Sequence, residues 1–338
     1  MTSVRASLRI GACLSLTGRF ARFGKQAALG LRVWRALVPD AVTLEIADDE
    51  SRPDRLRSEL ARLVGSADLV LGPYSTNLMR AAAETARDRD ALVWNHGGSG
   101  DDVETSAPGH VVSVLAPTSR YAVPFVERVA QVDPNSPLWL RPGRGSFGRQ
   151  VIDGAEMTAR RLGVPTVRVR AGEPLGAGDE RWNLFCAGSF EEDVDAINQY
   201  SELDNPPRLL GAVAAGVHEF ARSAERCEGI YGIAQWARGQ MPEPQVGPPE
   251  AVFLKEYLQR AGGPPDYPAV QAAAAAALAN HCAQAAGSVA RNSLWAAATA
   301  LRTTTMFGPF AVDPVSGAQV AHLPVLLRWT SDGLVPVR

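Results

Sequence analysis

Three glycines form the pattern G-x-G-x-x-G: Gly143, Gly145 and Gly148 lie between an apolar, strand-like run and an amphipathic segment typical of a helix. In dinucleotide-binding proteins such glycines let a pyrophosphate approach the backbone at a helix N-terminus, where N–H groups are free. A residue about 20 positions later then reads the ribose. Here that region holds Arg168 and Arg170, which would suit a 2′-phosphate. Taken alone, the pattern leaves open an NADP-dependent oxidoreductase.

A second group of polar residues lies where a strand-like run gives way to a helix-like segment. Ser75, Thr76 and Asn77 follow the apolar run LVLGPY and each carries a hydroxyl or an amide. These residue types favour helix N-caps. Donors at such a junction also bind the anionic or carbonyl end of a small molecule. We therefore expect ligand contact here, with N-capping as the structural alternative.

The segment NHGGSG is the next candidate loop along the chain. Gly97 and Gly98 offer free backbone, Ser99 offers a hydroxyl, and Asn95 opens the segment. His96 adjoins the loop and is a further possible ligand contact. A plain turn rich in glycine is the alternative.

The sequence lacks the motifs that several classes of enzyme require. Lys25 and Lys255 are the two lysines, and the chain contains no G-K-[ST], no Tyr-x-x-x-Lys pair and no G-x-S-x-G. These absences argue against a Walker A loop, a short-chain dehydrogenase and an α/β-hydrolase nucleophile. The sequence therefore gives no support to these three reaction classes.

The net charge and the spacing of the cysteines narrow the range of molecules that this chain is expected to bind. The formal net charge is -2, which gives no electrostatic attraction for nucleic acid or an anionic membrane. The four cysteines lie far apart without a C-x-x-C, so we expect no zinc site, while a disulfide stays open. The acids Asp48, Asp49 and Glu50 could work as an acid and a base, although capping the next helix or holding a loop is the more ordinary use.

The elements that must position these residues alternate between strand and helix, which indicates parallel sheets covered on both faces. In the first half we expect strands at 7–16, 42–50, 67–76 and 91–95, and helices at 25–37, 52–66 and 77–90. In the second half we expect strands at 137–142, 166–173, 183–190, 208–216 and 229–236, and helices at 119–132, 148–162 and 190–203. Alanine-rich helices at 249–304 and strands at 306–313 and 320–329 end the chain. A cleft between two α/β lobes is the natural ligand site of such an architecture.

The order of these pieces resembles a known family. The segments that carry the likeness are RIGACLSLTGRFARFGKQAALGLRVW, EIADDESRPDRLRSELARLV, LVLGPYSTNLMRAAAETARDRDALVWNHGGSGDD, SFGRQVIDGAEMTARRLG, GIYGIAQW and FGPFAVDPVSGAQV. Together they resemble the type I periplasmic binding proteins of the branched-chain amino acid receptor group, the substrate-binding components of ABC transporters. The resemblance covers nearly the whole chain. It implies an α/β fold of two lobes, each a parallel sheet flanked by helices, joined by a hinge, with lobe 1 at 1–117 plus 248–305 and lobe 2 at 118–247 plus 306–338.

The resemblance also implies which residues meet a ligand. Thr76, Gly97 and Ser99 match positions that hold the carboxylate and part of the ammonium of an amino acid, and Phe23 and Phe147 match aromatic positions of the pocket. In this interpretation the glycines of the opening pattern serve a tight turn and close packing, with no nucleotide required. The expected ligand-binding residues are Phe23, Ser75, Thr76, Asn77, Asn95, Gly97, Ser99, Phe147, Gln235 and Trp236.

One departure widens the choice of ligand. Members that bind amino acids commonly place an acid near the strand that corresponds to GIYGIAQW, and this segment has none. An unpaired ammonium in a closed cleft is costly to desolvate. An amino acid, an amide and a small organic or aromatic acid therefore all stay open.

The implied function is an extracytoplasmic receptor, monomeric or weakly dimeric, that closes on a small ligand and delivers it to an ABC permease. Such a receptor is not an enzyme, so the resemblance also implies no catalytic residues, no metal and no cofactor. Residues 1–9 show no apolar signal-peptide core. That observation favours the alternative of a cytoplasmic amide or amino acid sensor of the same fold, which would regulate a partner protein.

Overall fold

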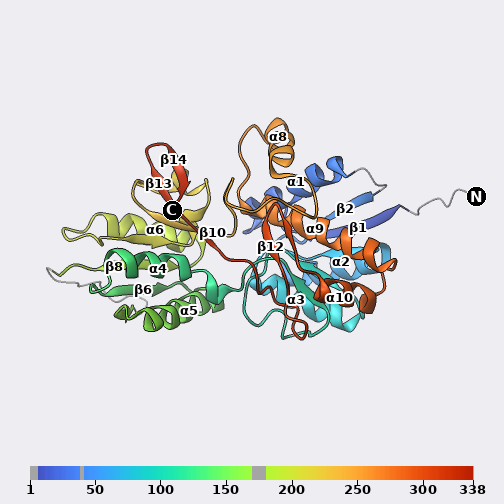
Figure 1. Ribbon diagram of the computed structural model, residues 1–338, viewed down its shortest axis with the longest axis horizontal. Helices are drawn as coiled ribbons and strands as arrows, with labels where there is room; N and C mark the ends of the chain where they lie inside the picture. Colours follow the sequence, from blue (N-terminus) through green and yellow to red (C-terminus); the bar gives the residue numbers. More distant parts are fainter. Residues whose placement is uncertain (1–6, 39–41, 170–179, 338) are drawn as a thin grey trace, which may run out of the picture. The chain divides into compact units, whose positions relative to one another are not determined.

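The computed structural model describes residues 7–38, 42–169 and 180–337. The chain divides into two compact units. Unit 1 contains Met1–Ala116 and Arg238–His322, and unit 2 contains Pro117–Ala237 and Leu323–Arg338. Each unit is an α/β sandwich of helices on a sheet (Figure 1). The chain therefore passes from one unit to the other at three places in the sequence.

The sheet of unit 1 has the strand order β2-β1-β3-β4-β5, and every neighbouring pair is parallel. Parallel strands that are covered on both faces are nearly continuous apolar runs, and β1, β3 and β4 fit this rule. Their carboxyl ends lie at one edge of the sheet, where the following loops meet. The strands are β1 (Leu8–Leu14), β2 (Val42–Asp48), β3 (Leu69–Leu71), β4 (Val93–Asn95) and β5 (Val111–Ser113).

The helices of unit 1 cover both faces of this sheet. The alanine-rich α9 is buried over most of its length and packs against α1 (Figure 1). A Cβ on Gly30 would lie 2.1 Å from the carbonyl oxygen of Ala269, so the two helices cross at a distance that only the smallest residues allow. The helices are α1 (Ala21–Leu37), α2 (Pro53–Ser66), α3 (Thr76–Asp88), α8 (Glu250–Ala261), α9 (Tyr267–Ala286) and α10 (Arg291–Ala300).

The sheet of unit 2 has the order β14-β13-β10-β9-β8-β6-β7. Its inner strands are parallel, whereas β13 pairs antiparallel with β10 and β14 pairs antiparallel with β13. The C-terminal hairpin therefore extends a sheet that the sequence analysis expected to be parallel throughout. The strands are β6 (Leu138–Pro142), β7 (Thr166–Arg168), β8 (Asn183–Ala187), β9 (Leu210–Ala212), β10 (Tyr231–Ala234), β13 (Val325–Thr330) and β14 (Gly333–Pro336).

Two apolar clusters bury the faces of this second sheet. One includes Phe125, Phe185 and Tyr231, and the other is centred on Trp182 and Phe220. The helical elements of unit 2 are η1 (Thr118–Arg120), α4 (Val123–Val132), α5 (Ser146–Leu162), α6 (Phe190–Ser201), η2 (Ala214–Gly216) and α7 (Phe220–Ser223).

The units differ from the predicted lobes at two segments and at Pro117, which lies in unit 2 rather than in lobe 1. Residues 238–247 and 306–322 lie in unit 1, whereas the sequence analysis assigned both to lobe 2. Hydrogen bonds explain the difference. The Gln319 side chain donates to the carbonyl of Val114 at 3.1 Å, and the hairpin of β11 (Thr303–Thr305) and β12 (Gly308–Phe310) accepts N–H groups from Gln245 and Val246.

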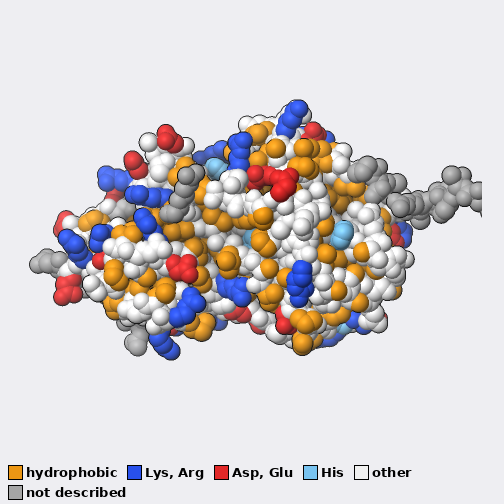
Figure 2. Space-filling view, viewed as in Figure 1, with side chains coloured by type: hydrophobic (Ala, Val, Ile, Leu, Met, Phe, Trp, Pro, Cys, Tyr) orange, Lys and Arg blue, Asp and Glu red, His pale blue; other side chains and the backbone are white. Residues whose placement is uncertain are grey.

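Basic and acidic side chains are interspersed on the face shown in Figure 2. Within the part of the chain that the structure describes, no helix has the length and apolar character needed to span a membrane.

Candidate functional site

The turn after β3 places Ser75 in an unusual backbone conformation. Its φ is +93° and its ψ is 144°, and its hydroxyl accepts the N–H of Leu78 at 3.4 Å as the N-cap of α3. A non-glycine residue in this region costs about 1–3 kcal/mol and persists only where its surroundings hold it, which is frequent at ligand sites. Ser75 therefore does serve as the N-cap of α3, and its backbone is strained at the same time.

The loop after β4 is hydrogen-bonded to this turn. The N–H of Ser75 donates to the carbonyl of Gly97 at 3.0 Å, and the N–H of Gly100 donates to the Thr76 hydroxyl at 3.1 Å. A Cβ on Gly97 would lie 2.6 Å from the carbonyl oxygen of Pro73. Glycine is thus required for the close approach, and two of the predicted ligand loops form one structure.

Asn95 holds the second loop from inside. Its side chain is 0% exposed, and its Oδ1 accepts the N–H groups of Gly97 and Gly98 at 3.1 and 2.8 Å. Its Nδ2 donates to the Gly98 carbonyl at 2.6 Å and to the Ser113 hydroxyl at 2.7 Å. The glycine amides that the sequence analysis expected to be free are therefore engaged. Direct ligand contact by Asn95 or Gly97 stays a prediction.

Two residues that the sequence analysis missed complete this arrangement. Ser113, at the end of β5, donates its hydroxyl to Oε1 of Glu104, and both side chains are buried. Burial raises the pKa of Glu104 to about 6, against the opposing hydrogen bond from Ser113. Neither residue belongs to a sequence motif, because their pairing depends on how the segment before β5 folds back.

Asn77 and Ser99 lie at opposite extremes of exposure. Asn77 is exposed, and its Oδ1 accepts from Arg80, which also makes a bidentate ion pair with Asp102 at 2.8 Å. Ser99 is 7% exposed and lies beside the loop glycines. His96 is fully buried, and burial lowers its pKa to about 4, so its imidazole is neutral at pH 7.

Phe23 contacts the same site through an aromatic stack. Its ring lies 4.3 Å from that of Tyr74 at an interplanar angle of 14°, and the Tyr74 hydroxyl is 2.8 Å from that of Tyr267. Tyr74 immediately precedes Ser75, so Phe23 joins the two loops as one cluster in unit 1. Half-burial leaves part of the Phe23 ring accessible.

The acidic cluster after β2 shapes the first loop. Asp48 accepts the backbone N–H groups of Leu16 and Thr17 and the Thr17 hydroxyl at 2.7 Å. Asp49 accepts the Ser15 hydroxyl at 2.6 Å. These bonds give the acids the loop-holding role that the sequence analysis considered the ordinary one.

Three of the predicted residues lie in unit 2. Phe147, in the first turn of α5, is half-buried and meets the edge of Tyr121 with ring centroids 5.6 Å apart. Gln235 and Trp236 follow β10 and are buried. Among the described residues the Trp236 indole N–H has no hydrogen-bond acceptor. Buried donors normally have one, so this group is suited to a bound acceptor.

The glycines of the opening pattern serve packing. A Cβ on Gly143 would lie 2.3 Å from Cα of Gly188, and one on Gly148 would lie 2.3 Å from the carbonyl oxygen of Ala187. Gly145 has a φ of +90° and precedes α5. Close packing and a turn thus account for all three glycines without a nucleotide.

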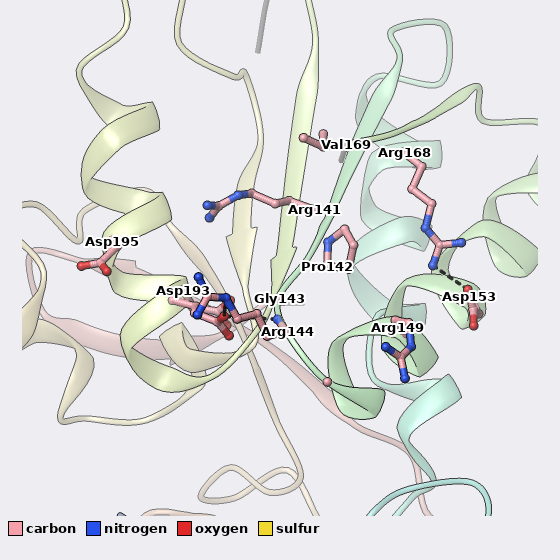
Figure 3. Close-up of a pocket in the computed structure, with 12 residues that line it drawn as sticks. Arg141, Pro142, Gly143, Arg144, Arg149, Asp153, Arg168, Val169, Asp193 and Asp195 are labelled. Atoms are coloured by element: carbon pink, nitrogen blue, oxygen red, sulfur yellow. Dashed lines mark hydrogen bonds and ion pairs between the residues drawn. The ribbon is translucent and has the colours of Figure 1, made fainter. Parts of the chain in front are cut away.

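A cavity of about 890 Å³ lies beside this turn, at the carboxyl ends of β6 and β7 (Figure 3). Arg168 pairs with Asp153 at 2.7 Å on one wall. Burial raises the pKa of Asp193, at the floor, to about 7. Arg170, the other residue considered for a 2′-phosphate, lies outside the described residues. The ionisable lining consists of Arg141, Arg144, Arg149, Arg168, Asp153, Glu192, Asp193 and Asp195. The mixed charge of this set does not favour a pyrophosphate.

The cysteines are free thiols, and three of them, Cys13, Cys186 and Cys282, are buried. Within residues 7–38, 42–169 and 180–337, no group of three or more His, Cys, Asp or Glu residues is arranged to hold a metal ion.

Comparison with known proteins identifies the family. Residues 7–179, about half of the chain, match the family described as periplasmic binding protein. The chain belongs to this family, which confirms the resemblance found in its ordered motifs. A search of curated proteins returns no match.

Solved structures of binding proteins share the fold. A leucine binding protein from Thermotoga maritima is 14% identical with a TM-score of 0.83, covering 98% of each chain. A substrate-binding protein from Desulfitobacterium hafniense in complex with Leu is 15% identical with a TM-score of 0.80, covering 98% of this chain and 99% of that one. A solute binding protein from Rhodopseudomonas palustris BisB5 in complex with 3,4-dihydroxy benzoic acid is 14% identical with a TM-score of 0.78, covering 97% and 95%. These likenesses confirm the expected α/β fold.

Proposed function

We propose that this chain is the solute receptor of an ABC transporter and that it binds a small polar metabolite without transforming it. The observation that carries the proposal is the hydrogen-bonded junction of the Ser75 turn and the Gly97 loop at the carboxyl edge of the unit 1 sheet. Ligands of open α/β sheets bind outside the carboxyl ends of the strands. The family supports an extracytoplasmic location.

In unit 1 the anionic or carbonyl end of the ligand would lie at the start of α3. The helix dipole and the first-turn N–H groups favour an anion there. The hydroxyls of Thr76 and Ser99 would border this position, and Phe23 would cover the apolar part of the ligand. Because the Gly97 and Gly98 amides bind Asn95, the hydroxyls and the helix terminus carry the proposed contact.

In unit 2 the proposed contacts are Phe147, Gln235 and Trp236. The Trp236 N–H would donate to an acceptor on the ligand. Gln235 and Trp236 are uncharged, so the two residues directly after β10 supply no carboxylate to pair with an ammonium. This favours an amide or a small organic or aromatic acid over an α-amino acid, and one of the similar proteins is in complex with an aromatic acid.

Binding that engages residues of both units would favour closure about a hinge, because a ligand shifts an equilibrium only through its different affinity for the two states. A membrane permease would then recognise the closed form.

A thermal-shift screen with amino acids, amides and aromatic acids tests this function. A true ligand at about 100 times its dissociation constant stabilises the protein by roughly 2.7 kcal/mol. Thr76→Val and Ser99→Ala should weaken binding, whereas Ser66→Ala, which removes a hydroxyl bonded to Arg62 at the end of α2, should not. Absence of any shift across the screen, or equal binding by all three variants, would count against the proposal.

A further inference from the structure

A chain of buried polar side chains runs beneath the Gly97 loop. Asn95, Ser113 and Glu104 are 0%, 1% and 5% exposed. They come from the ends of β4 and β5 and from the segment between these strands. Asn95 donates to Ser113, and Ser113 donates to Glu104. The loop above them therefore stands on a continuous hydrogen-bonded support.

The donors and acceptors that these three side chains carry fix the direction of the hydrogen bonds between them. An ionised carboxylate only accepts, so the Ser113 hydroxyl must donate to Glu104. The Ser113 oxygen then accepts from Asn95, which fixes the amide with Nδ2 toward Ser113 and Oδ1 toward the loop. In this orientation Oδ1 receives the N–H groups of Gly97 and Gly98 at 3.1 and 2.8 Å. The opposite amide orientation would place an NH₂ group against two N–H donors.

We propose that Glu104 and Ser113 are positioning residues for the ligand loop, acting through the amide orientation of Asn95 on Gly97 and Gly98. The inference deepens the proposed function and rests on it where ligand binding is concerned. Its structural part concerns loop order in the ligand-free protein, which is measurable by itself. Neither Glu104 nor Ser113 needs to touch the ligand.

The surroundings of Glu104 concentrate negative charge. Asp101 and Asp102 both act on it electrostatically, and Asp102 itself pairs with Arg80. Burying a carboxylate among acids costs free energy of folding, because the charged form is desolvated. The Glu104 carboxylate is therefore a poor stabiliser of unit 1, but it is a strong acceptor that sets the direction of the hydrogen bonds from Asn95 through Ser113.

Hydrogen exchange of the Gly97 and Gly98 amides in the ligand-free full chain provides the test. We expect Ser113→Ala and Glu104→Leu to speed exchange at both amides by about tenfold, which corresponds to about 1.4 kcal/mol. Glu104→Gln should restore near wild-type protection, because its amide oxygen can accept the Ser113 hydroxyl. Ser113→Ala keeps the test decisive if Glu104→Leu fails to fold.

Thr85→Ala is the matched control. It removes another buried hydroxyl of unit 1, bonded to the Ala81 carbonyl at 2.8 Å within α3, without touching the chain beneath the loop. It should change global stability and leave the ratio of the glycine exchange rates to those of the β1 amides unchanged. Unaltered protection of Gly97 and Gly98 in Ser113→Ala, or equal loss in Thr85→Ala, overturns the inference.

Ligand titration separates the two proposals. If wild-type protein binds a compound from the screen, Ser113→Ala should weaken its affinity about as much as it loosens the loop, and Glu104→Gln should not. Faster exchange with unchanged affinity overturns the link to binding. Failure of the wild-type protein to bind any compound counts against the proposed function alone, since the exchange rates decide loop positioning without a ligand.

Discussion

The backbone N–H of Ser75 donates to the carbonyl oxygen of Gly97 at 3.0 Å, and this bond joins the turn after β3 to the loop after β4. Ser75 keeps a φ of +93° in this position, although it carries a Cβ. The strain and the bond belong together, because a residue stays in a costly conformation only where its neighbours hold it. The junction is thus a strained turn that a hydrogen bond from the neighbouring loop holds in place.

Replacing Ser75 tests the strain. Ser75→Gly should be more stable than Ser75→Ala by about 1–2 kcal/mol, because both lose the cap while only glycine relieves the positive φ. Urea unfolding of the two variants at pH 7 measures the difference. An alanine variant as stable as the glycine variant would show that the backbone here is not strained.

Close packing at the loop gives a second prediction. A Cβ on Gly98 would lie 2.3 Å from Cβ of Met79, so Gly98→Ala should lower the free energy of unfolding by about 1–3 kcal/mol. Gly65→Ala in α2 is the control, because a Cβ at this position would meet no atom within 4 Å. This substitution should stabilise the helix by about 0.5–1 kcal/mol, since alanine favours a helix more than glycine does. Equal effects of the two substitutions would contradict the proposed packing.

Much of the fold followed from the sequence because its rules are local. Strand and helix alternate in apolar runs, and parallel strands bring their carboxyl ends to one edge, which is why the loops at Ser75 and Gly97 could be predicted to meet. The alternation within β4 also turns Asn95 and Val93 to one side and Trp94 to the other. The local pattern does not predict which of these two sides forms the hydrogen bonds to the Gly97 loop.

The parts that sequence reasoning missed are contacts between distant segments. Glu104 and Ser113 are in contact because the chain folds back before β5, and no rule of sequence spacing predicts this contact. Likewise, Gln319 reaches the Val114 carbonyl from 205 positions away, which takes residues 306–322 into unit 1. The glycine pattern misleads for the same reason, since the nearest atoms to a Cβ at Gly143 or Gly148 belong to β8 and to the residue after it.

Glu104 predicts a pH dependence of stability. Burial raises its pKa from 4.5 to about 6, so between these values the folded chain binds more protons than the unfolded chain. The free energy of unfolding should therefore fall as pH rises from about 4.5 through about 6, by about 2 kcal/mol from this group.

Urea unfolding between pH 4 and pH 7 measures this slope in the wild-type protein and in Glu104→Gln, whose side chain does not titrate. Asp193, with a pKa raised to about 7 by burial, contributes to both proteins and cancels in the difference. A difference curve that is flat, or that rises with pH, would contradict the assignment to Glu104.

Phe147→Ala separates ligand contact from core packing in unit 2. Phe147 is half-buried against Tyr121, so its removal should cost the ligand-free protein much less than the about 3–5 kcal/mol expected for a fully buried phenylalanine. Phe185→Ala, whose ring is 0% exposed, provides that reference value. The stabilisation by any ligand found in the screen should disappear in Phe147→Ala, as measured by the shift in melting temperature. If the ligand-free Phe147→Ala protein unfolds as readily as Phe185→Ala, the ring belongs to the core and its place in the ligand site is wrong.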